Sequence, residues 1–153
     1  MKAILEAAGF LTRTRRTLRY GSFSREPLML LRVEWKGDSV ACDWLMRSAD
    51  PWDKYLPVPL AEEHQTLQAL RDALSLRDII FKSFPAVTTA DLRMFRADAE
   101  HHLELMMVGS VSRSNEIMRR VASVAMQAKL CGFRFTLREG SLGSLAPVSF
   151  GCS

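Results

Sequence analysis

The sequence predicts a single α+β domain, residues 1–153, in which two longer helices cover one face of an antiparallel sheet of about five or six strands. Two observations lead to this prediction. Two segments alternate apolar and polar residues on either side of a turn, which is typical of β-hairpins. Other segments carry a single apolar stripe at helical spacing. A chain of 153 residues has the usual size of one domain.

The N-terminal segment predicts a short helix followed by an extended basic stretch. Ile4, Leu5 and Ala8 share one side of a helix over 2–8, and Gly9 suits the left-handed position that follows a helix. We interpret at least part of 10–23 as a strand.

The first hairpin is the clearest element of the sequence. Apolar residues alternate with charged residues over 31–36 and again over 40–46, and Gly37-Asp38 between them suits a two-residue turn. The alternation predicts a register with one apolar face and one opposite-charge pair. The expected partners are Trp35 with Val40, Val33 with Cys42, Leu31 with Trp44, and Arg32 with Asp43.

A helix is expected from Pro59, because proline suits the first helical turn, and Leu67, Leu70 and Leu74 form a stripe. It ends before Pro85, either as one helix or as two.

A second hairpin is expected over 92–107, with its turn at 98–101. Pairing Leu92 with Met107 and Met94 with Leu105 gathers apolar residues on one face. Phe95 and Met106 would then make the outer face partly apolar as well.

The last third of the chain predicts a helix and then a strand. The helix starts at Ser112 or Ser114 and ends at Gly132. A strand follows over 133–137, and the tail is expected to hold one short strand near 148–150.

The composition indicates a soluble, cytoplasmic protein. No apolar stretch approaches the roughly 20 residues of a membrane span, and Met1–Phe10 lacks the long apolar run of a signal peptide. The three cysteines are an odd number without close spacing, which fits reduced thiols. The net charge of +4 is too modest to identify a partner.

The leading candidate for ligand binding is the proline-rich loop Asp50–Pro59. Trp52 and Tyr55 provide large contact area, Asp53 adds a carboxylate, and His64 follows on the next helix. The alternative is structural: Trp52 packs at the edge of the core and His64 is a partly buried helix residue.

An anion-binding site is the second candidate. Arg13, Arg15 and Arg19 would share one face of a strand, and Arg113 lies where the last helix is expected to begin. The alternative is a solvated surface whose arginines pair with carboxylates.

No metal site or cofactor site is expected. Glu100, His101, His102 and Glu104 are possible ligand types, but in a strand His101 points away from His102 and Glu104. We interpret this segment as an exposed hairpin tip.

These observations leave three classes of function open. The leading hypothesis is a binding or interaction module, a homodimer, with a ligand or partner held near Asp50–Pro59. The first alternative is a small enzyme whose site assembles from distant residues, with Asp50, Asp53, His64 and His102 as the groups to test. The second alternative is nucleic-acid or anion binding through Arg13–Arg19, which is weaker because no nucleic-acid motif accompanies these arginines.

Overall fold

The structure is a computed structural model, and it describes residues 2–18, 28–47, 55–98, 100–113, 123–138 and 141–145. Its elements follow one another as three helices and seven strands within these residues. They are α1 (Lys2–Thr17), β1 (Met29–Lys36), β2 (Ser39–Leu45), α2 (Val58–Ser83), β3 (Thr89–Ala97), β4 (Leu103–Ser112), α3 (Val124–Cys131), β5 (Phe133–Arg134), β6 (Thr136–Arg138) and β7 (Ser141–Gly143).

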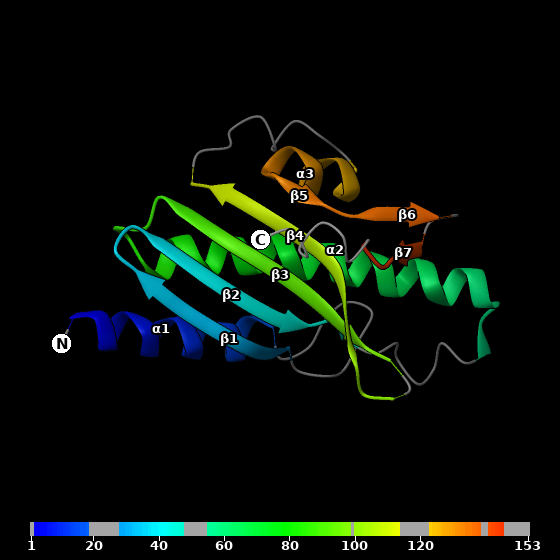
Figure 1. Ribbon diagram of the computed structural model, residues 1–153, viewed down its shortest axis with the longest axis horizontal. Helices are drawn as coiled ribbons and strands as arrows, with labels where there is room; N and C mark the ends of the chain where they lie inside the picture. The colour runs from blue at the N-terminus through cyan, green and yellow to red at the C-terminus, as the bar shows by residue number, and fades with distance from the viewer. Residues whose placement is uncertain are drawn as a thin grey trace.

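The protein is α+β, and its main sheet has the strand order β1-β2-β3-β4-β5 (Figure 1). The sheet is mixed, because β2 and β3 run parallel while the other neighbouring pairs run antiparallel. The expected purely antiparallel sheet is therefore wrong. The reason lies in the connection: α2 is long enough to carry the chain back along the sheet, so that β3 starts at the same end as β2.

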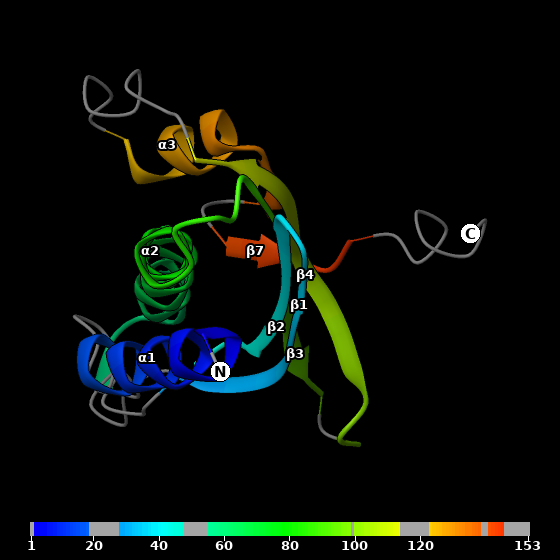
Figure 2. The same ribbon diagram turned by 90° about the vertical axis from the view of Figure 1, so that its left-hand side faces the viewer.

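The helices lie on one side of the sheet, and the described elements leave the other face of β1–β4 open (Figure 2). The core fills the space between these layers. Trp44, Leu92, Met94 and Met107 project from the sheet into it, and Leu76 meets them from α2. The candidate site lies on this open face.

The pairing of β1 with β2 follows the predicted register over most of its length. Trp35 lies opposite Val40, Val33 opposite Cys42, and Arg32 opposite Asp43. Leu31 does not pair with Trp44, because the register shifts between Leu30 and Arg32 and Leu30 takes that position. The extra residue of this irregularity turns Leu31 toward solvent, where its side chain is exposed.

The predicted pairing of β3 with β4 is wrong by two residues. Met94 lies opposite Met107 and Leu92 opposite Gly109, with a register shift between Met94 and Phe95. This irregularity buries Met106 as well as Met107, so Met106 is not on the outer face as expected. Gly109 is required here because the ring of Phe133 lies 2.6 Å from where its Cβ would be.

Helix α1 continues through Gly9, so the expected helix end at Gly9 and the expected strand within 10–17 are wrong. The physical reason is the spacing of Phe10, Thr14 and Leu18. These three residues recur every four positions and are all buried, which is the pattern of a helix face. Thr14 satisfies its buried hydroxyl by donating to the carbonyl oxygen of Phe10 at 2.8 Å.

Helix α2 spans the expected range as one unbroken helix, with Pro57 before it and Phe84 after it. Beyond the predicted stripe it also buries the polar side chains of Thr66, Gln68, Asp72 and Arg77. It therefore packs against neighbours on several sides.

Gly132 ends α3 with φ +110°, as predicted. The predicted helix start at Ser112 is wrong, because Ser112 is the last residue of β4, and Ser114 lies outside the described residues. The expected strand over 133–137 is instead divided between β5, which joins the main sheet, and β6, which pairs with β7 in a separate two-stranded sheet. The strand expected near 148–150 lies outside the described residues.

Candidate functional site

The open face of the sheet carries a row of apolar side chains that crosses four strands. Met29 lies opposite Leu45, Leu45 opposite Phe95, and Phe95 opposite Leu105. Leu103 lies two residues from Leu105 on β4, so both point to the same side. Met29 is 58% exposed and Leu103 54% exposed. We call these five residues the apolar strip.

The surface of the apolar strip is concave where it crosses β3 and β4. A cavity of about 470 Å³ lies there, lined by Phe95, Leu103, Leu105 and Leu145, with Arg93 and Glu104 also in its wall. Leu145 is held in place because its backbone N–H donates to the carbonyl oxygen of Leu105 at 2.8 Å. The cavity can receive an apolar side chain from a partner.

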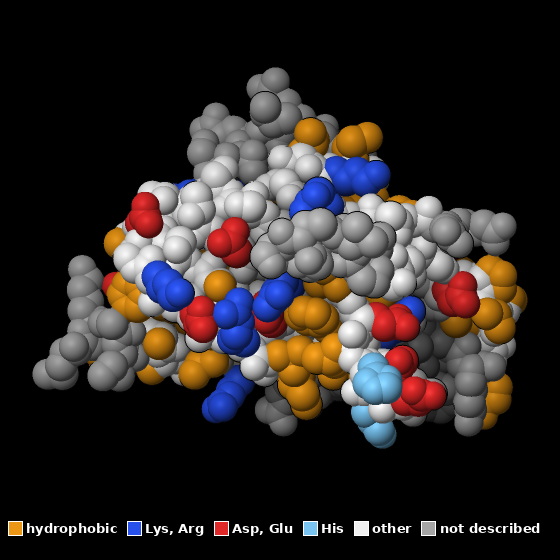
Figure 3. Space-filling model, in the orientation of Figure 1, with side chains coloured by type: hydrophobic (Ala, Val, Ile, Leu, Met, Phe, Trp, Pro, Cys, Tyr) orange, Lys and Arg blue, Asp and Glu red, His pale blue; other side chains and the backbone are white. Residues whose placement is uncertain are grey.

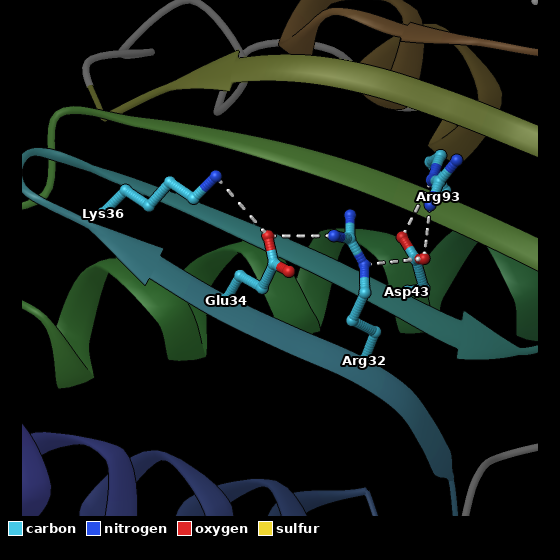
Figure 4. A network of polar contacts seen from close by, with 5 residues as sticks. All are labelled: Arg32, Glu34, Lys36, Asp43 and Arg93. Atoms are coloured by element: carbon cyan, nitrogen blue, oxygen red, sulfur yellow. Dashed lines mark hydrogen bonds and ion pairs between the residues drawn. The ribbon is translucent and has the colours of Figure 1, made fainter.

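A charged network lies beside the strip on the same face (Figure 4). Asp43 accepts hydrogen bonds from Arg32 at 3.2 Å and from both Nε and an Nη atom of Arg93, at 2.9 and 2.6 Å. Glu34 joins Arg32 at 3.0 Å and Lys36 at 4.0 Å. The hydrogen bonds that Arg93 donates to Asp43 raise the pKa of Arg93.

This network also orders the edge of the strip. The guanidinium of Arg93 lies 5.3 Å from the ring centre of Phe95, within the range of a cation–π contact. Since two bonds to the buried Asp43 carboxylate fix Arg93, the phenyl ring packs against a rigid neighbour. The strip is thus positioned before any partner binds.

On the far side of the strip lies the turn between β3 and β4. Asp98 Oδ1 accepts hydrogen bonds from the backbone N–H groups of Glu100 and His102, at 2.9 and 2.8 Å. His101 takes a positive φ of 65°. We call residues 98 and 100–102 the hairpin tip. Figure 3 shows the hydrophobic side chains of the open face between a group of charged residues and the histidines.

A second candidate lies among the helices. A cavity of about 320 Å³ is lined by an ion pair between Arg47 Nε and Asp72 Oδ2, which are 2.9 Å apart. The side chains are 1% and 3% exposed. Burial raises the pKa of Asp72 to about 6 and lowers the pKa of Arg47, although each charge partly offsets the effect on the other.

The ion pair in the wall of the Arg47–Asp72 cavity is held in place by hydrogen bonding within the chain. Gln68 donates to the second oxygen of Asp72 at 2.8 Å, so both carboxylate oxygens have partners. Perturbed ionisable groups beside a cavity are found at binding sites and also in structural ion pairs. The Arg47–Asp72 ion pair joins the end of β2 to the middle of α2, so a structural role is sufficient to explain it.

No protein-family model, curated protein or solved structure matches this chain. Among the described residues, the open face and the Arg47–Asp72 cavity are the candidates for a functional site.

The predicted ligand-binding residues are only partly described. Trp52 and Asp53 lie outside the described residues. Tyr55 is 73% exposed just before α2, and His64 is half-buried on α2. Neither lines the two cavities described above. Leu45, the last residue of β2, belongs to the strip, and residues 48–54 lie outside the described residues.

The predicted anion-binding arginines do not form the expected strand face. Arg13 and Arg15 lie on helix α1, and Arg13 donates to the hydroxyl of Ser83 at 3.1 Å. Arg19 lies outside the described residues.

Arg113 is engaged by the chain itself. Its guanidinium donates to the carbonyl oxygens of Phe81, Phe84, Pro85 and Val87, at distances from 2.6 to 3.1 Å. These contacts link the end of β4 to the end of α2, so the observed role of Arg113 is structural.

Two features are absent from the part of the chain that the structure describes. No helix there combines the length and the apolar composition needed to cross a bilayer. No cluster of three or more His, Cys, Asp or Glu side chains is arranged there to hold a metal ion. The thiol of Cys42 is buried in the core, and burial raises its pKa to about 12, so it stays protonated.

Sequence reasoning missed the apolar strip as a unit. It placed Phe95 on the outer face, but assigned Leu105 to the core through the incorrect register. Nothing in the sequence marks Met29 or Leu45 as part of a binding surface, because each is an ordinary apolar residue at the end of a strand. Only the order of the strands brings residues from 29 to 105 into one row.

Proposed function

We propose that this protein is a binding module that associates with a protein partner through the open face of its sheet. The observation that carries this proposal is the apolar strip: within the described residues Met29 and Leu103 are exposed and the other three members are partly exposed, although a complete core fills the other side of the sheet. Contiguous exposed apolar residues mark interaction surfaces because burying them is favourable, by about 25 cal/mol per Å².

The surroundings of the strip support the same proposal. Charged residues flank it, which gives the apolar centre and polar rim that protein interfaces share. Leu45 of the strip also precedes, by five residues in the chain, the segment 50–59 in which the sequence predicts ligand or partner binding. The homodimer expected from the sequence stays a proposal.

Native mass spectrometry of the purified protein tests this function. We expect the wild type to carry an associated mass, either a second copy or another retained molecule. Leu103→Asp places a charge at an exposed position at the β4 end of the strip, so it should abolish the association without unfolding the chain.

The matched control is Leu5→Asp. Leu5 is 69% exposed on α1, on the helical side of the sheet, and should keep the associated mass. A bare monomer for the wild type, or equal loss in both variants, would contradict the proposal.

A further inference from the structure

We draw no further inference here: the strongest candidate, the apolar strip on the open face of the sheet with the cavity beside Phe95, already carries the proposed function, and nothing within the residues that the structure describes shows what covers it.

Discussion

Asp72 and Arg47 show how a single buried group can set the pH dependence of stability. The pKa of Asp72 rises from its ordinary value near 3.8 to about 6, because its carboxylate is removed from water. The native protein therefore holds this proton to higher pH than the unfolded chain does. The contribution of Asp72 to stability is fully present below about pH 3.8 and is lost as the pH rises through about 6.

Asp72→Asn removes this titration and keeps the shape of the side chain. We expect the unfolding free energy of the wild type, relative to the variant, to fall by about 2–3 kcal/mol between pH 4 and pH 7, since one pKa unit corresponds to about 1.4 kcal/mol. Urea denaturation at several pH values measures it. Asp78→Asn, an exposed position on the same helix, is the control, and its difference from wild type should stay within about 0.5 kcal/mol. A difference that is constant or grows with pH would exclude this role for Asp72.

At the scale of elements, two glycines that follow similar sequence patterns have opposite roles. Gly132 ends α3 at φ +110°, and a Cβ there would lie 2.7 Å from the carbonyl oxygen of Ser110. Gly9 lies inside α1, with no atom within 4 Å of where its Cβ would be. The two positions therefore form a natural pair for substitution by alanine.

Gly132→Ala should destabilise the protein by about 1–3 kcal/mol or more, because alanine is strained at that φ and meets the strand beside it. Gly9→Ala should stabilise it by about 0.5–1 kcal/mol, because alanine favours the helix interior. Thermal and urea denaturation of both variants give these values. Destabilisation by Gly9→Ala would show that α1 does not continue through residue 9.

Arg113 joins two elements through its planar guanidinium. Lysine keeps the positive charge but cannot reach several carbonyl oxygens in different directions. Arg113→Lys should therefore cost about 1–3 kcal/mol of unfolding free energy, whereas Arg134→Lys at an exposed position should change it by less than about 0.5 kcal/mol. Equal effects of the two substitutions in urea denaturation would argue against the structural role of Arg113.

On the scale of the whole molecule, the arrangement of the two sheets predicts which strands resist local unfolding most strongly. β2 and β3 are paired on both edges and covered by α2, whereas β6 and β7 form their own two-stranded sheet. Isolated two-stranded sheets are marginally stable in water. Amide hydrogen exchange should therefore be slowest in β2 and β3 and faster by orders of magnitude in β6 and β7. Similar protection in both sheets would contradict this division.

The fold was predictable where the signal is local. Trp35 opposite Val40 follows from the alternation around Gly37, because a short turn leaves few registers that bury one face. The range of α2 follows from its flanking prolines and apolar spacing. The register of β3 with β4 was not predictable in the same way, because an extra residue near Met106 shifts the pairing without changing the composition of either strand.

The sequence by itself determined the α+β class, the extent of α2, the alternation of β1 and β2, and the capping role of Gly132, because each depends on residues close together in the chain. Only the tertiary structure decided that β3 lies parallel to β2, that Arg93 joins Asp43, and that Met29, Leu45, Phe95 and Leu105 form one row. These features depend on strand order, which the path of α2 across the sheet sets through contacts between distant residues.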